Sequence, residues 1–115
     1  MEMFTPLYLE IRAALEFEIL SGRIQPGQEI PSLRALAEQY HVNGSTARYA
    51  LAGLRRAALV IKPRRGEPLR VTSDTELIAS LRQKKIDELT EKCIRQLKLL
   101  GCSAEEIKTL LLNYV

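Results

Sequence analysis

The amino-acid sequence predicts a mainly α-helical fold with one small β-hairpin. Three features support this prediction. Apolar residues recur at helical spacing along most of the 115 residues, turn-forming clusters separate these runs, and one short aliphatic run precedes a basic, proline-containing loop. This length suits one domain with a small appendage. The predicted parts are residues 1–72 and a helical tail at residues 73–115.

The composition is that of an ordinary globular chain, with 46% apolar, 27% charged and only 5% aromatic residues. No apolar run approaches the ~20 residues that a membrane-spanning helix needs. The first ten residues, MEMFTPLYLE, lack the features of a secretory signal. The two cysteines, Cys93 and Cys102, do not have metal-ligand spacing. We therefore expect a cytoplasmic protein without a membrane partner, a metal or another cofactor.

The first predicted helix has clear boundaries. Thr5 is a suitable N-cap residue, Pro6 suits the first helical position, and Ser21-Gly22 is a stop signal. A helical wheel gives two apolar faces, one with Tyr8, Ile11, Leu15 and Ile19, and one with Leu9, Ala13, Phe17 and Leu20, separated by Arg12 and Glu16. Each apolar face of a helix needs its own packing partner. We therefore expect the second face to contact another element of this chain or a partner chain.

Two short helices are predicted next. Pro26-Gly27 marks a turn in the connector IQPGQEIP, Ser32 is the N-cap of one helix, and Asn43 is the N-cap of the other. The predicted inward-facing residues are Leu33, Leu36 and Ala37 in the former helix and Ala47, Ala50, Leu51 and Leu54 in the latter. Small inward residues allow two helices to cross closely, and HVNG supplies a short turn. This pattern predicts a helix-turn-helix.

A basic hairpin follows the helix-turn-helix. The run Leu59-Val60-Ile61 is predicted to begin a strand, PRRGEP to form a loop, and LRV to return as a second strand, which makes the hairpin a wing. Residues 44–72 have a net charge of +6, whereas residues 1–43 have −3 and residues 73–115 are neutral. A concentrated basic segment in a nearly neutral chain indicates a polyanion-binding face. A solvated basic surface is the alternative.

The tail is predicted to be a helical hairpin. Apolar residues recur at helical spacing up to Gly101, and Ser103 with Glu106 forms a capping box that opens a last helix. Because such a hairpin has no second layer to cover its apolar stripe, we expect it to form a dimer. The predicted dimer residues are Leu81, Ile86, Leu89, Cys93, Leu97 and Leu100, together with Phe17 of the first helix. Cys93 is accordingly expected to be buried.

The order of these segments resembles the GntR family of bacterial transcriptional regulators. The resemblance covers roughly residues 6–72, and its most specific parts are SGRIQPGQEIPSLRALA and the AL-x-x-L of the third helix. The short tail is similar to that of the YtrA-like subfamily, in which it dimerises the regulator. The resemblance implies a homodimeric, sequence-specific DNA-binding regulator, expected to be a repressor, on an inverted-repeat operator. The implied partners are duplex DNA, a second copy of the chain and an unknown small-molecule effector.

The candidate DNA-binding residues follow from the docking of a recognition helix. Its N-terminal residues meet base edges in the major groove, where hydroxyl groups bond phosphates or bases and arginine forms paired hydrogen bonds with guanine. Ser45, Thr46 and Arg48 are the candidates in this helix, and Arg34 is a candidate near the start of the preceding helix, where the chain should cross the DNA backbone. The resemblance implies the same four residues and adds Arg65 and Gly66 at the wing tip. Arg64, next to them, is a further candidate.

The sequence departs from the family at several points. His41 occupies a corner that is often Gly and that requires a positive φ. Gly44 replaces a common arginine, and the wing ends in GEPLR, where Arg70 is a possible replacement phosphate contact. These departures favour an alternative function, a winged-helix protein-interaction module that has lost operator binding. The basic segment argues against this alternative. The single histidine has no nucleophile partner at a suitable spacing, so no enzyme is predicted.

Overall fold

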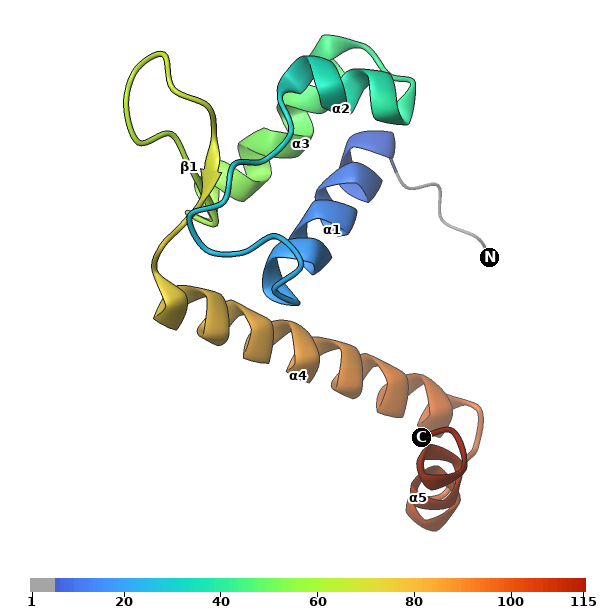
Figure 1. Ribbon diagram of the computed structural model, residues 1–115. Coiled ribbons are helices and arrows are strands. Elements are labelled where there is room, and N and C mark those ends of the chain that lie inside the picture. The colour runs from blue at the N-terminus through green and yellow to red at the C-terminus, as the bar shows by residue number, and fades with distance from the viewer. Residues whose placement is uncertain (1–5) are drawn as a thin grey trace. The chain divides into compact units, whose positions relative to one another are not determined.

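The computed structural model describes residues 6–115, which form two compact units, one up to Ser80 and one from Leu81 to Val115 (Figure 1). The elements are α1 (Leu7–Leu20), α2 (Leu33–Tyr40), α3 (Gly44–Arg56), β1 (Val60–Ile61), β2 (Arg70–Val71), α4 (Thr75–Leu99) and α5 (Ala104–Asn113). The mainly helical fold with a small wing, predicted from the sequence, is confirmed.

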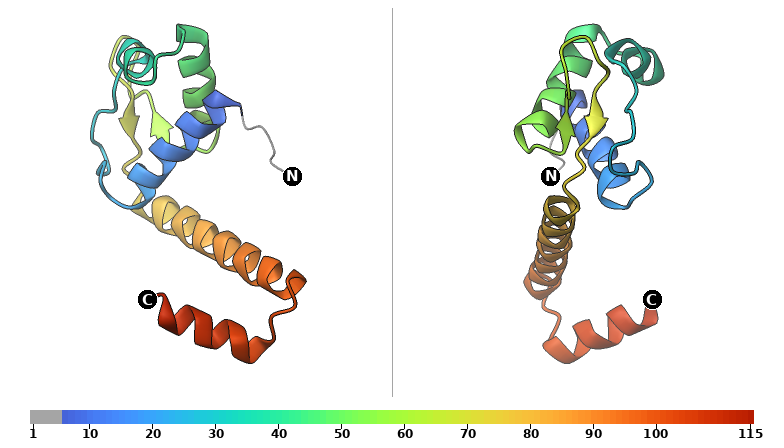
Figure 2. Two further views of the ribbon diagram at one scale, coloured as in Figure 1. Left: turned by 90° about the vertical axis from the view of Figure 1, so that its right-hand side faces the viewer. Right: turned by 60° about the vertical axis from the view of Figure 1, so that its left-hand side comes forward.

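The core of the first unit lies where α1 and α2 pack against α3, with the wing beside them (Figure 2). Every residue of α3 that was predicted to face inward is buried, and so are Ile11, Leu15 and Ile19 from the first apolar face of α1. The second face of α1 is different, because Leu20 is buried whereas Phe17 is 51% exposed. The two apolar faces therefore have different surroundings in this unit.

Local side-chain bonds determine where the helices of the helix-turn-helix begin. Ser32 Oγ accepts from the Ala35 N–H at 3.1 Å, and Asn43 Oδ1 accepts from the Thr46 N–H at 2.8 Å, as the capping signals predicted. His41 follows α2 with φ 55° and ψ 47°, the left-handed conformation expected at this corner. Ser32 thus sets the start of α2, and His41 and Asn43 turn the chain from α2 into α3.

Helix α1 begins one residue later than the sequence predicted. Pro6 has φ −55° and ψ 140°, which is an extended rather than a helical conformation, so it is the N-cap and Leu7 is the first helical residue. The Pro6 carbonyl accepts from the Leu9 N–H at 3.0 Å. Thr5, the predicted N-cap, lies outside the described residues.

The wing is built from more of the chain than the hairpin alone. Strands β1 and β2 are antiparallel, with Val60 opposite Val71. On the other edge of β2, the Ile30 N–H donates to the Leu69 carbonyl at 3.0 Å and the Gly27 N–H donates to the Val71 carbonyl at 2.9 Å. The connector between α1 and α2 thus pairs with β2, which protects both edges of this short strand. The sequence indicated only a turn there.

The junction between α3 and the wing has an unusual conformation. Ala58 has φ 63°, and the Leu59 N–H donates to the Leu54 carbonyl at 3.1 Å, the reversal that usually ends a helix at a glycine. For an alanine this left-handed conformation costs about 1–2 kcal/mol. The reversal directs the buried Leu59 and Val60 into the core, whose packing holds Ala58 in this conformation.

In the second unit, the predicted capping box opens α5. The Glu106 N–H donates to Ser103 Oγ at 3.1 Å, and the Ser103 N–H donates to Glu106 Oε1 at 3.0 Å. Ile107 is the buried residue of α5, and no residue of α4 is buried. Cys93, which was predicted to lie in the dimer contact, has an exposed thiol in the single chain. No helix within residues 6–115 is long and apolar enough to cross a membrane.

Candidate nucleic-acid interface

Helix α3 has one face in the core and one in solvent. Ala47, Ala50, Leu51 and Leu54 are the buried residues, and Ser45 and Arg48 at the N-terminal end of the helix are exposed, with Thr46 half-buried. This arrangement follows from helical periodicity, since residues three and four apart share a face. Ser45, Thr46 and Arg48 are residues that the sequence assigned to DNA contact, and none of them is buried.

The N-cap residue of α3 organises its first turn. Asn43 Oδ1 accepts both the Thr46 N–H at 2.8 Å and the Ser45 hydroxyl at 2.9 Å. The Ser45 oxygen keeps its lone pairs as acceptors, and the Asn43 carboxamide keeps Nδ2 as a donor. The N-terminal end of α3 therefore offers both hydrogen-bond donors and hydrogen-bond acceptors, although Gly44 contributes no side chain. The sequence assigned Asn43 a capping role only.

Arg34 lies on the second residue of α2, and its Nε is 3.5 Å from Glu38 Oε1. Both side chains are largely exposed, and an exposed pair at this helical spacing contributes only about 0.3–0.5 kcal/mol. Replacing Glu38 by a phosphate group as the partner of Arg34 would therefore lose little free energy.

The wing tip is a closed turn despite its unusual sequence. The Glu67 N–H donates to the Arg64 carbonyl at 3.1 Å, and Gly66 has φ 85°. A positive φ at the third position is what a type II turn requires, which explains the glycine. The side chains of Arg64 and Arg65 are exposed, so the turn presents both guanidinium groups to solvent.

Arg70 has an internal partner instead of the phosphate suggested from the sequence. Its Nη1 donates to the Gly27 carbonyl at 3.1 Å, and the bond is partly buried. Because β2 pairs with the connector, the side chain meets the turn at Gly27. The Arg70 guanidinium therefore holds the connector on the wing.

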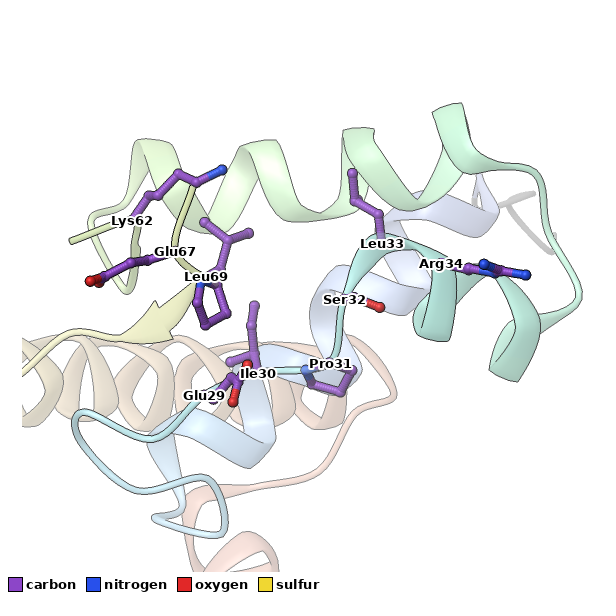
Figure 3. Close-up of a pocket in the computed structure, with 10 residues that line it drawn as sticks. Glu29, Ile30, Pro31, Ser32, Leu33, Arg34, Lys62, Glu67 and Leu69 are labelled. Carbon is purple, nitrogen blue, oxygen red and sulfur yellow. The ribbon is translucent and has the colours of Figure 1, made fainter. Parts of the chain in front are cut away.

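A hollow of about 320 Å³ lies between the start of α2 and the wing (Figure 3). Its lining includes Arg34 and Lys62 with Glu29 and Glu67. Figure 3 shows that Arg34 and Lys62 lie at opposite sides of this hollow, with Arg34 pointing away from the wing. Of the candidate DNA-binding residues, Arg34 lines this hollow, whereas Arg64, Arg65 and Gly66 of the wing tip do not.

Sequence reasoning missed the role of Arg12, which was predicted only to separate the apolar faces of α1. In the structure its guanidinium bonds backbone carbonyls of α3. One signal could have revealed this contact. Gly53 stands in the middle of the helical pattern of α3, and an isolated glycine in a helix often marks a close packing contact.

Comparisons with known sequences agree with this geometry. The model of the bacterial regulatory proteins of the gntR family matches residues 7–68. The chain is 29% identical over 102 residues to the uncharacterized HTH-type transcriptional regulator YhcF of Bacillus subtilis (strain 168), covering 89% of this chain and 84% of that protein. It is 34% identical over 82 residues to the HTH-type transcriptional repressor NagR of the same strain, covering 62% of this chain but only 34% of NagR.

Solved structures show the same similarity. A GntR family transcriptional regulator from Listeria monocytogenes has a TM-score of 0.89 at 27% identity, with 98% of each chain covered. The DNA-binding domain of AraR, in complex with operator ORR3, has a TM-score of 0.59 at 28% identity and covers 63% of this chain and 86% of that chain. The latter similarity involves a domain that was crystallised on its operator.

Proposed function

This chain belongs to the GntR family of bacterial regulatory proteins, and we propose that it is a homodimeric repressor of the YtrA-like type that reads an inverted-repeat operator. Its family consists of transcriptional regulators with a DNA-binding domain. The observation that supports base reading in this chain is the exposed N-terminal face of α3, with Ser45 and Arg48, within a segment of net charge +6.

The proposed division of work follows from the chemistry of each group. Arg48 pairs with a guanine edge, because its guanidinium can donate to O6 and N7 together. Ser45 and Thr46 contact phosphates or base edges near the helix end. Arg34 and the wing tip, with Arg64, Arg65 and Gly66, meet the backbone on either side. Phosphate contacts provide most of the affinity, and base contacts select the site.

The exposed apolar residues of the tail support a dimer. In the single chain Leu89 is 49% exposed and Leu100 is 81% exposed. Leu81, Ile86, Leu89, Cys93, Leu97 and Leu100 are the proposed tail contacts, with Phe17 of α1 as a further one. A second copy of the chain would cover this stripe, and two recognition helices would then reach half-sites about 34–36 Å apart. The proposed dimerisation part remains residues 73–115.

The proposed repressor role is supported by the similarity to NagR, whose name describes a repressor. Repression requires only that a bound dimer occupies the promoter, so it needs no additional part of the chain. A small-molecule effector that changes operator affinity is a further proposed partner, and it would be found as a compound that shifts DNA binding.

Selection of bound fragments from the source genome tests the function directly. The full chain should enrich an inverted repeat and bind it with two chains per duplex. Its logarithmic affinity should fall linearly with the logarithm of salt concentration, by about 0.9 for each phosphate contact. Random duplex of equal length is the control. Binding that does not distinguish the two duplexes would contradict sequence-specific regulation.

One observation favours a different function. Gly44 leaves the head of α3 without a long side chain, and such a surface also suits contact with a protein. In this second candidate the winged helix is a protein-interaction module without an operator. The selection experiment separates the two, because that module would show neither an enriched repeat nor a salt-dependent preference.

Replacing Arg65 by alanine should weaken binding to operator and random DNA alike and reduce the salt slope by about 1 unit. The reason is its exposed position in the wing-tip turn, where a guanidinium meets phosphate or the minor groove. Salt titrations by fluorescence anisotropy measure the slope. Arg23→Ala is the matched control, since it removes an exposed arginine outside the proposed interface. An unchanged slope in Arg65→Ala would show that the wing does not touch DNA.

A further inference from the structure

An arginine of α1 is hydrogen-bonded to the recognition helix. Arg12 Nη2 donates to the Tyr49 carbonyl at 3.0 Å, and Arg12 Nε lies 3.3 Å from the Ala50 carbonyl, to which it also donates. These carbonyls lie 37 and 38 residues away in the sequence. They directly follow Arg48, the proposed base reader. One side chain thus attaches to α3 at two adjacent points.

One aromatic ring lies against this guanidinium. Arg12 Cζ is 5.5 Å from the centre of the Tyr8 ring, a distance at which a cation is attracted to the ring face. The Tyr8 and Tyr49 rings are 5.9 Å apart and tilted by 49°. The tilted arrangement is a favourable one for two aromatic rings. Tyr8, on the same helix as Arg12, therefore helps to hold the guanidinium in one orientation.

Gly53 makes room for the attachment. A Cβ atom built at this position would overlap the guanidinium of Arg12. Glycine is among the least favourable residues in a helix interior, so its presence in α3 needs a packing reason. The reason here is contact with Arg12, because the missing side chain lets the guanidinium lie directly on the helix backbone.

We propose that Arg12 is a positioning residue for operator recognition: through the Tyr49 and Ala50 carbonyls and the space at Gly53, it sets the rotation and axial position of α3. This inference rests on the proposed DNA-binding function. It assigns Arg12 no contact with DNA. Its consequence is that a residue outside the recognition helix controls how well Arg48 discriminates between bases.

The physical basis is the strict geometry of base reading. A functional side chain works only when it is held within about 0.5 Å of its productive position. The carbonyls that Arg12 bonds also belong to the backbone ladder of α3, so a shift at either one moves the whole helix. Contacts to phosphate tolerate such shifts better, because random DNA is bound without a specific register.

The DNA arm of the test compares four proteins: the parent, Arg12→Ala, Gly53→Ala and the double variant. The ratio of operator affinity to random-DNA affinity should fall roughly tenfold in each single variant. The double variant should fall no further, because both changes break the same contact. Gly53→Ala leaves the net charge unchanged, so its affinity for random DNA should remain within about twofold of the parent. Arg23→Ala is the charge control for Arg12→Ala.

The stability arm tests the contact without DNA. Alanine is a better helix former than glycine, so Gly53→Ala should raise the melting temperature of the Arg12→Ala protein. In the parent the same change displaces the guanidinium, so the gain should be smaller by about 4 °C or reversed. Circular dichroism provides both the melting curves and the helix content. Affinities are then measured at a temperature where all four proteins are folded.

Three results would overturn the proposal. The first is an unchanged affinity ratio in folded Arg12→Ala or Gly53→Ala. The second is an equal loss of affinity for operator and random DNA in Arg12→Ala, larger than the loss in Arg23→Ala and accompanied by a smaller salt slope. That result would show that Arg12 contacts phosphate. The third is an equal effect of Gly53→Ala on melting temperature in both backgrounds. A parent that does not prefer the operator would instead overturn the proposed function, and this inference with it.

Discussion

The Leu97→Asp variant is expected to be monomeric at concentrations where the parent is a dimer. Leu97 belongs to the proposed contact stripe of α4 and is half-buried in the single chain. Burying an uncompensated carboxylate at an interface is unfavourable by about 3 kcal/mol or more, which raises a dissociation constant by at least about 100-fold. Sedimentation equilibrium over a range of concentrations measures this change.

Two further variants make this experiment decisive. Leu89→Asp places the same charge on the stripe at a residue that is already 49% exposed, so it disturbs the packing of the single chain less. Arg95→Gln changes the net charge by the same amount about 200° around the helix from Leu97. It should remain dimeric. If both aspartate variants keep the parent's helix content, remain dimeric in sedimentation and bind the operator normally, the dimer contact lies elsewhere.

The Arg48→Ala variant should weaken binding to the selected operator by about 1–3 kcal/mol for each half-site, while binding to random DNA changes little. Arg48 is exposed at the start of the second turn of α3, and the nearby Ala47 and Ala50 are buried. Its removal should therefore leave the core unchanged. The operator profile should also relax at one base pair of each half-site, which a repeat of the fragment selection would reveal.

Arg56→Ala provides the control for Arg48→Ala. It removes one arginine from the same helix, but from the last turn, away from the end that enters the groove. It should affect operator and random DNA equally or have no effect. Equal losses on both duplexes in Arg48→Ala would show that Arg48 contacts phosphate and that another residue selects the site. Asn43, with its free Nδ2 donor at the helix head, would then be the next to examine.

Local chemistry made much of the site predictable. The caps at Ser32 and Asn43 involve residues three positions apart, and the left-handed corner at His41 involves its immediate neighbours. Helical periodicity correctly predicted which residues of α3 face inward, because a helix repeats its faces regardless of its surroundings. The exposure of Ser45 and Arg48 follows from the same periodicity.

The sequence by itself therefore determined the helices, the turns between them, the basic segment and the family. Tertiary structure decided what could not be read from neighbouring residues. Arg12 reaches Tyr49 across 37 residues, and Arg70 reaches Gly27 across 43. Periodicity assigns a side chain to a face but not to a partner, because the partner depends on how separate elements pack. For this reason Arg12, predicted only to separate two apolar faces, bonds the recognition helix, and Arg70, suggested as a phosphate contact, bonds the connector.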